Sequence, residues 1–317
     1  MTPADLPAYA RRISPSRGRF RRWWLHLILR LTAKRMPIVD VDIQKLRAQH
    51  ATLEKWFAHV EPGTRRTPVD CSGVAAEWID TPESRRERVL LYFPGGAFIF
   101  RSPEIHAGVL AAWSRRLGAR VLMVHYRLAP EHPYPAAPDD CHRAYRWLLA
   151  QGYAPSNIVL GGDSAGGNLA LATLHAIKAC GEPMPACVAL LSPVVDFALG
   201  GRSLVTNEGS DPTFGFAWLI ALRWLYAPPE RYLDIAISPL HGDFTGFPPL
   251  LFQVGSIEIF LDESTRAAAR AHAAGVAVEL EIWDGMGHVF QLARFLPQSA
   301  VAADHIVTFI RQRTGWV

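Results

Sequence analysis

The stretch Gly162-Asp163-Ser164-Ala165-Gly166-Gly167 decides the fold, because it places a serine between two glycines where one sequence pattern gives way to another. The short apolar run Asn157–Gly161 before it predicts a buried strand. The Ala- and Leu-rich run Leu169–Lys178 after it predicts a helix. A serine at such a strand-turn-helix junction has the order of a nucleophile elbow. The sequence therefore predicts that Ser164 is a nucleophile.

The glycines around Ser164 fit a tight, strained turn. Such a turn leaves no room for side chains two residues before and two residues after the serine, where Gly162 and Gly166 stand. The N–H of Ala165 would point out of the helix terminus, where unpaired donors and the helix dipole favour negative charge. Ala165 is therefore a candidate donor to an acyl oxyanion. The alternative is an ordinary strand-to-helix turn, and partner residues for the serine would argue against it.

A serine hydroxyl needs a base, and histidine is the usual base near neutral pH. In folds with a nucleophile elbow, the acid and then the histidine follow the serine along the chain. His288 follows a predicted strand, Val278–Trp283, and a loop that contains two glycines. Catalytic groups of open α/β sheets gather at the carboxyl ends of the strands. We therefore expect His288 to be the base, since His175, His272 and His305 lie in helix-like segments.

The acid is expected on a loop after another strand, between Ser164 and His288. The run Pro249–Val254 predicts that strand, and Glu258 is the first carboxylate after it. Asp262 is the alternative, because either carboxylate could orient an imidazole and stabilise its charged form. Glu263 more closely fits the first turn of the next helix, where acidic residues are favourable.

A glycine pair follows an earlier apolar strand, Arg88–Phe93, in the loop Pro94-Gly95-Gly96-Ala97. Such a loop can turn backbone N–H groups toward a ligand, as an oxyanion hole requires. Two of the N–H groups of Gly95, Gly96 and Ala97 are therefore candidate donors beside that of Ala165. A plain hairpin turn is the alternative reading of the glycine pair.

Three blocks of sequence together are far more specific than a bare serine motif: Tyr126–Ala137 (YRLAPEHPYPAA), Asp139-Asp140, and Gly162–Asn168 (GDSAGGN). From about residue 88 to the C-terminus, the chain resembles the bacterial hormone-sensitive-lipase-like carboxylesterases, the family IV esterases of the α/β-hydrolase superfamily. The resemblance implies an α/β-hydrolase fold with a mostly parallel sheet, helices on both faces and a helical cap. Within the first block, Glu131 and Asp140 are expected to be structural partners.

The resemblance implies Ser164 as nucleophile and His288 as general base and acid. Glu258 stands where this family usually has aspartate, which keeps Asp262 open as the triad acid. The family's His-Gly-Gly-Gly loop has Pro94 in place of its histidine and Ala97 in place of its third glycine. The alanine is tolerable at this position if its backbone angles are ordinary.

Composition is compatible with one large α/β domain or a core with a smaller cap, since half of the 317 residues are hydrophobic. The four cysteines (Cys71, Cys141, Cys180 and Cys187) form no metal-ligand spacing and predict free thiols in a reducing, cytoplasmic compartment. No HExxH, CxxC or phosphate-cradling glycine loop is present, so no metal or cofactor is implied.

Positive charge is concentrated at the N-terminus, where residues 1–60 hold 12 Lys/Arg and 4 Asp/Glu. The segment Arg19–Leu31 is basic and apolar, is too short to span a bilayer and has no convincing cleavage site of a signal peptide. We expect it to be a cap helix, with peripheral membrane contact as the alternative. Nucleic-acid binding is not expected.

We therefore expect N-terminal cap helices in residues 1–55 and a catalytic domain in residues 56–317, with a cap insertion at about 197–245. The expected function is hydrolysis of short- to medium-chain carboxylic esters, a small-molecule substrate, through an acyl-enzyme on Ser164. Alternatives are lactones, amides or acetylated small molecules with the same triad, a membrane-surface lipase, or a non-catalytic ligand receptor of this fold. The sequence leaves both a monomer and an oligomer open.

Overall fold

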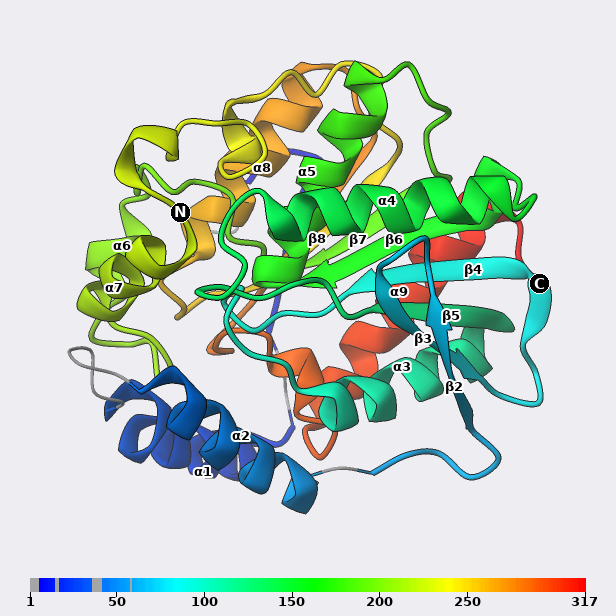
Figure 1. Ribbon diagram of the computed structural model, residues 1–317. Coiled ribbons are helices and arrows are strands. Elements are labelled where there is room, and N and C mark those ends of the chain that lie inside the picture. Colours follow the sequence, from blue (N-terminus) through cyan, green and yellow to red (C-terminus); the bar gives the residue numbers. More distant parts are fainter. Residues whose placement is uncertain (1–5, 15–16, 36–41, 58) are drawn as a thin grey trace.

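The computed structural model describes residues 6–14, 17–35, 42–57 and 59–317, and a nine-stranded sheet runs through this part of the chain (Figure 1). The strands are β1 (Ala10–Ile13), β2 (Arg65–Asp70), β3 (Ala75–Asp80), β4 (Arg85–Phe93), β5 (Ala119–Val124), β6 (Ile158–Asp163), β7 (Cys187–Leu191), β8 (Leu250–Gly255) and β9 (Val278–Trp283). Their order across the sheet is β1-β9-β8-β7-β6-β4-β5-β3-β2. All neighbouring strands are parallel except β2 with β3 and β3 with β5.

Helices cover both faces of this sheet, as the sequence predicts (Figure 1). The helices of the described residues are α1 (Arg19–Leu31), α2 (Ile43–Phe57), α3 (Pro103–Leu117), α4 (Ala136–Ala150), α5 (Ala165–Ala179), α6 (Ser203–Thr206), α7 (Phe216–Tyr226), α8 (Leu261–Ala273) and α9 (Pro297–Thr314), of which α4, α5 and α8 cover one face and α3 and α9 the other. Single 3-10 turns are η2 (Ala33–Arg35), η3 (Pro155–Asn157), η4 (Pro229–Arg231), η5 (Pro239–His241) and η6 (Phe290–Leu292). The expected mostly parallel α/β fold is confirmed.

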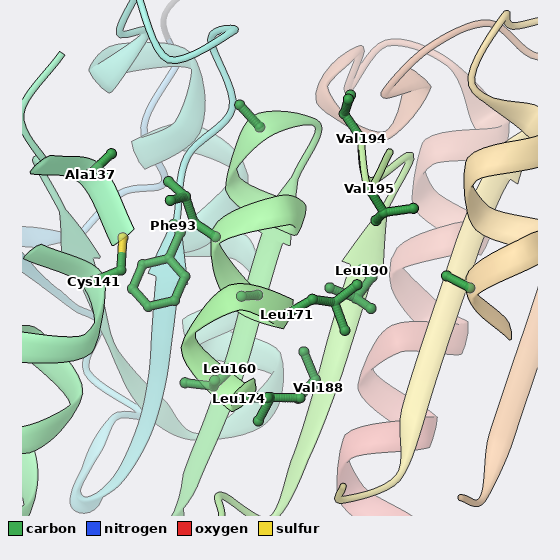
Figure 2. Close-up of a cluster of buried hydrophobic side chains, with 14 of the residues drawn as sticks. Phe93, Ala137, Cys141, Leu160, Leu171, Leu174, Val188, Leu190, Val194 and Val195 are labelled. Carbon is green, nitrogen blue, oxygen red and sulfur yellow. The ribbon is translucent and has the colours of Figure 1, made fainter. Parts of the chain in front are cut away.

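The sheet separates two hydrophobic cores, because successive side chains of a strand point to opposite faces. On β4, Leu91 and Phe93 belong to the core under α4, α5 and α8, whereas Leu90 and Tyr92 belong to the core under α3 and α9. Figure 2 shows the first core, where Phe93 lies beside Cys141. Burial of each large apolar side chain contributes about 2 kcal/mol.

The N-terminal segment differs in one respect from the helices expected for residues 1–55. Ala10–Ile13 form the edge strand β1, parallel to β9. The strand supplies backbone partners to β9, since Leu280 N donates to Tyr9 O and Asp284 N donates to Ile13 O. Its side chains are held as well, because Arg12 Nε lies 2.9 Å from Asp284 Oδ1.

Beyond β1, the N-terminal part of the chain contributes α1 and α2, which Figure 1 places together on one side of the molecule. Among the described helices, none is both long enough and apolar enough to cross a membrane.

The stretch after β7 has no strand until β8, as expected from its lack of alternating apolar residues. It forms α6, α7 and short turns instead. The loops after β4, β6, β7, β8 and β9 meet at one edge of the sheet, because these five strands are parallel neighbours. This edge carries the residues that the sequence singles out.

Candidate active site

Ser164 sits between β6 and α5 in a backbone conformation that non-glycine residues rarely adopt, with φ 54° and ψ −118°. The flanking glycines make this turn sterically feasible. A Cβ atom at Gly162 would lie 2.3 Å from the carbonyl oxygen of Gly166, and one at Gly166 would lie 1.7 Å from that of Phe93. The N–H of Ser164 donates to Leu191 O at 2.8 Å, which fixes the turn to the neighbouring strand. The elbow is thus a strained turn at the start of a helix, as the sequence predicts.

His288 and Glu258 form a buried pair on the loops after β9 and β8. His288 Nδ1 lies 2.6 Å from Glu258 Oε2, and the side chains are 6% and 0% exposed. The other ring nitrogen, Nε2, is buried and has no hydrogen-bond partner among the described residues. A neutral imidazole with Nδ1 protonated keeps its Nε2 lone pair for a proton, which is the state that a general base requires.

The Glu258 carboxylate is oriented by two more donors. Its Oε1 accepts hydrogen bonds from Ser192 Oγ at 2.7 Å and from Gly255 N at 2.6 Å. Asp262, the alternative acid, lies elsewhere: its Oδ2 accepts a hydrogen bond from Ser203 N at 3.0 Å, at the start of α8. Glu258 is therefore the carboxylate that contacts His288, whereas Asp262 bonds to the backbone of a different segment, at Ser203.

The three candidate oxyanion donors on the loop after β4 differ in whether their N–H group already has a partner in the protein. Gly95 N donates to Asp163 Oδ1 at 3.0 Å, so this N–H is already used inside the protein. Gly96 and Ala97 remain as donors from this loop, beside Ala165 at the first turn of α5. Ala97 has φ 54°, so the backbone angles of this alanine are not ordinary. A left-handed backbone costs an alanine about 1 to 2 kcal/mol, so the loop is strained at Ala97.

Pro94 stands where the family that the chain resembles has histidine, and it is held through its backbone. Tyr126 Oη donates to Pro94 O at 2.6 Å, and Tyr126 is 2% exposed. The loop is therefore fixed at both ends of the Pro94–Gly95 peptide, by a tyrosine hydroxyl and by the Asp163 carboxylate.

Asp163, which precedes the nucleophile, is the centre of a buried hydrogen-bond network. Its Oδ1 accepts hydrogen bonds from Tyr92 Oη at 2.9 Å and from His106 Nε2 at 3.0 Å, in addition to Gly95 N. His106 Nδ1 lies 2.8 Å from Ser102 O, which can only accept. Both ring nitrogens of His106 thus face acceptors, so the geometry favours a charged imidazolium under the oxyanion loop.

The pKa directions agree with this charge pair. Burial by itself lowers the pKa of His106, but the charge and hydrogen bond of Asp163 outweigh burial, and the pKa is raised above 6.5. Burial by itself raises the pKa of Asp163, but the charge of His106 and the donors around the carboxylate outweigh it, and the pKa is lowered below 3.8.

A loop from the stretch after β7 braces the acid and the base. Asn207 Nδ2 donates to Glu258 O at 2.9 Å. The buried carboxylate of Asp211 accepts hydrogen bonds from Ile259 N at 2.8 Å and from the Phe214 backbone N–H at 3.1 Å. The ring centroid of Phe214 lies 5.0 Å from that of His288 in an edge-to-face arrangement. Residues 207–214 therefore help to hold both partners of the buried pair in place.

Sequence reasoning missed these supporting residues, namely Tyr92, His106, Ser192, Asn207 and Asp211. Each acts through a partner that is distant along the chain, so no local motif marks it. One signal was available: Asp163 follows an apolar strand directly, where an unpaired carboxylate would be costly to bury. This signal shows that Asp163 needs a buried partner, but it does not mark His106 as that partner.

The Asp163–His106 pair predicts a pH dependence of stability. A raised folded-state pKa at His106 gives stabilisation that is complete below pH 6.5 and is lost as the pH rises through the folded-state pKa. The free energy of unfolding of the protein should therefore fall on the alkaline side, with a slope of at most about 1.4 kcal/mol per pH unit from this group. His106→Gln should remove this component, which urea unfolding between about pH 6 and about pH 9 measures.

His125→Gln is the matched control, because burial and the nearby Arg101 lower the pKa of His125, so this histidine supplies no stabilisation that is lost as the pH rises. An alkaline slope in the His106→Gln protein equal to that of the unsubstituted protein would contradict the charged pair.

Comparison with known proteins identifies the family to which this arrangement belongs. A family model described as the alpha/beta hydrolase fold matches residues 90–292. An acetyl-hydrolase of Streptomyces hygroscopicus is 39% identical over 279 residues, which cover 86% of this chain and 91% of that protein. The carboxylesterase/phospholipase LipF of Mycobacterium tuberculosis is 36% identical over 264 residues, which cover 80% of this chain and 70% of LipF.

Among solved structures, an esterase from the bacterial hormone-sensitive lipase family superimposes with a TM-score of 0.88 at 38% sequence identity. The match covers 94% of this chain and 99% of that esterase. The chain therefore belongs to the hormone-sensitive-lipase-like, family IV esterases of the α/β-hydrolase superfamily and is a carboxylic ester hydrolase.

Proposed function

We propose that the protein hydrolyses carboxylic esters through an acyl-enzyme on Ser164. The observation that carries the proposal is the buried His288–Glu258 pair at the sheet edge that also carries Ser164. His288 Nε2 has no hydrogen-bond partner among the described residues, so it can accept a proton. In acylation, Ser164 Oγ bonds to the ester carbonyl carbon while His288 Nε2 takes the serine proton. The imidazolium then gives that proton to the leaving alcohol as the ester C–O bond breaks.

Deacylation repeats the steps with water. His288 takes a proton from water, the hydroxyl oxygen bonds to the acyl carbon, and the proton returns to Ser164 Oγ as the acyl bond breaks. Glu258 stabilises the imidazolium in both halves. In each half the carbonyl oxygen becomes an oxyanion, for which we propose the N–H groups of Gly96, Ala97 and Ala165 as donors.

We propose short- to medium-chain acyl groups as the preferred substrates. The rings of Phe214 and Phe260 lie with centroids 5.0 Å from that of His288, which supports an apolar and confined surrounding for the reacting ester. The similarity to an acetyl-hydrolase supports a small acyl group. The same triad could act on lactones, amides or acetylated small molecules, which a substrate panel would separate.

Substitution of the nucleophile tests the mechanism. Ser164→Ala should lower kcat on p-nitrophenyl butyrate by at least about 10⁴-fold, since the acyl group loses its point of attachment. Initial rates measured from acetate to laurate esters should show the highest kcat/KM at the shorter chains in the unsubstituted protein. Circular dichroism is the control for an intact fold. Residual turnover close to that of the unsubstituted enzyme would contradict the assignment of Ser164.

A matched pair of carboxylates tests the triad acid. Glu258→Gln should lower kcat on the order of 10⁴-fold, because an amide cannot stabilise the imidazolium and favours the wrong tautomer. Asp262→Asn should leave kcat within a few-fold, since its carboxylate bonds to Ser203 N. The reverse ranking of these two variants in steady-state kinetics would assign the acid to Asp262.

We also propose that α1, α2 and residues of about 197–245 form a cap over this edge. Contacts of α1 support it: Arg22 Nη1 donates to Asp284 O at 3.1 Å, and Arg30 Nη2 donates to Ser210 O at 2.9 Å. On α2, Arg47 Nε donates at 2.8 Å to Ile99 O, just after the oxyanion loop. The cap proposal excludes Ala10–Ile13, which pair with the sheet.

Peripheral contact of α1 with lipid is a second proposal. The helix exposes an apolar face, with 71% of Phe20, 56% of Trp23 and 49% of Ile28 accessible to solvent. Phe20 and Ile28 recur at helical spacing with the exposed Trp24 and Leu31, so these four lie on one side and Trp23 flanks them. Arg22, which contacts Asp284, lies on the opposite side of the helix. Exposed Arg19 and Arg35 at the two ends of the segment are suited to anionic headgroups.

Trp23→Glu tests lipid contact. The fraction of protein that sediments with anionic phospholipid vesicles should fall roughly tenfold, because a carboxylate replaces an interfacial indole. The control is Trp224→Glu on α7, where the indole is 63% exposed but lies outside the α1 face. Hydrolysis of soluble p-nitrophenyl acetate should be unchanged in both variants. Equal sedimentation of the two variants, or no sedimentation of the unsubstituted protein, would exclude α1 as a lipid contact.

A reducing compartment remains our proposal for the protein's location. All four cysteines are free, and Cys71, Cys141 and Cys187 are buried. Free thiols are the ordinary state of cysteines in the cytoplasm.

A further inference from the structure

Three potential metal ligands meet where α4 packs beside α5. His142 lies on α4, Cys180 caps the C-terminal end of α5, and Glu182 follows two residues later. A ring nitrogen of His142, Cys180 Sγ and a Glu182 carboxylate oxygen all lie within 4.8 Å of one another. Among the described residues, this is the group of histidine, cysteine and acidic side chains that approaches the geometry of a metal site.

The chain geometry brings these side chains together. Gly181 has φ 64°, a left-handed conformation that ends α5 and reverses the chain between Cys180 and Glu182. The reversed segment is fixed to the helices, since Glu182 N donates to Ile177 O at 3.0 Å and Tyr145 Oη donates to Pro183 O at 2.5 Å. The three ligand atoms are therefore carried by a well-anchored turn and a packed helix.

Both oxygens of the Glu182 carboxylate have partners, and a bound metal would replace the contact between one of them and His142. Arg146 Nε lies 3.1 Å from Glu182 Oε1, which orients the carboxylate. The other oxygen, Oε2, lies 2.6 Å from His142 Nε2. The side chains of His142 and Glu182 are 16% and 18% exposed, and Cys180 is exposed, so an ion could enter from solvent.

We propose that His142, Cys180 and Glu182 bind a borderline-soft divalent cation such as Zn²⁺. Imidazole, thiolate and carboxylate are its usual protein ligands, and water would complete four-coordination. Ligand atoms in such a tetrahedron are separated by about 3.3 to 3.6 Å, so shifts of about 1 Å in the side chains suffice. Thiolate and carboxylate together match the charge of the ion. As the metal bonds form, the thiol proton passes to solvent, and the Nε2 proton of His142 leaves as well, so that the neutral ring keeps its one proton on Nδ1.

The site is at the far end of α5 from Ser164, so its expected effect is structural. A bound ion would link α4 to the turn after α5. It would stabilise the folded protein by binding the native state alone, with no direct contact to the catalytic groups. The ordinary alternative is a hydrogen-bonded His142–Glu182 pair beside an unrelated exposed thiol.

Cobalt binding distinguishes a metal site from a hydrogen-bonded His142–Glu182 pair beside an unrelated thiol. Full-length protein, stripped with chelator and kept reduced, should bind one equivalent of Co²⁺ with a thiolate-to-metal charge-transfer band in the near ultraviolet. Cys180→Ser should abolish the band, and His142→Ala and Glu182→Gln should each weaken binding about tenfold or more. His132→Ala, at an exposed histidine outside the cluster, is the control and should bind as the unsubstituted protein does.

Thermal unfolding gives a second readout. Saturating Zn²⁺ should raise Tm by roughly 5 °C in the unsubstituted protein and should not do so in Cys180→Ser. Both measurements can overturn the proposal: no charge-transfer band in the unsubstituted protein, or an equal band and equal Tm shift in Cys180→Ser, would leave only the His142–Glu182 hydrogen bond.

Discussion

The buried carboxylate of Asp163 links the turn at Ser164 to the loop after β4, the two segments for which we propose the nucleophile and the oxyanion donors. It precedes the nucleophile, and it holds Gly95 N–H and the His106 imidazole on the neighbouring loop and helix. A charge removed from water is stable only when paired and hydrogen-bonded, which these donors achieve. The strained elbow and the oxyanion loop are thus fixed relative to each other before substrate binds. This preorganisation is how a site stabilises developing charge without reorganising during the reaction.

The rest of the site follows from the same sheet edge. Neighbouring parallel strands present Ser164, Ser192, Glu258 and His288 on consecutive loops, and the Ser192 hydroxyl donates to Glu258. Residues 207–214 then pack against the acid and the base through backbone hydrogen bonds and the Phe214 ring. The catalytic groups therefore rest on the rigid sheet, while the surroundings of the substrate are built by segments that the sheet does not constrain.

Local patterns were sufficient for the strands and helices around the site, and for the residues that a motif or a strand end marks. The elbow, the strand before His288 and the loop at Gly95 each have a short-range signature, so their positions could be predicted. The pairing of His106 with Asp163 could not be predicted, because the two residues are far apart in sequence and no motif marks His106. For the same reason, the edge strand Ala10–Ile13 was missed: its four residues gain their partners only from β9. The cluster of His142, Cys180 and Glu182 likewise has no sequence spacing that marks it.

The central claim is that an acyl group is carried on Ser164 between the two halves of the reaction. The most direct test is intact-protein mass spectrometry after rapid acid quench during turnover of p-nitrophenyl butyrate, followed by peptide mapping. The account predicts a butyryl adduct on the peptide that contains Ser164, and none on the Ser164→Ala protein. An adduct on another residue would contradict the account. So would a butyryl adduct of equal abundance on the Ser164→Ala protein.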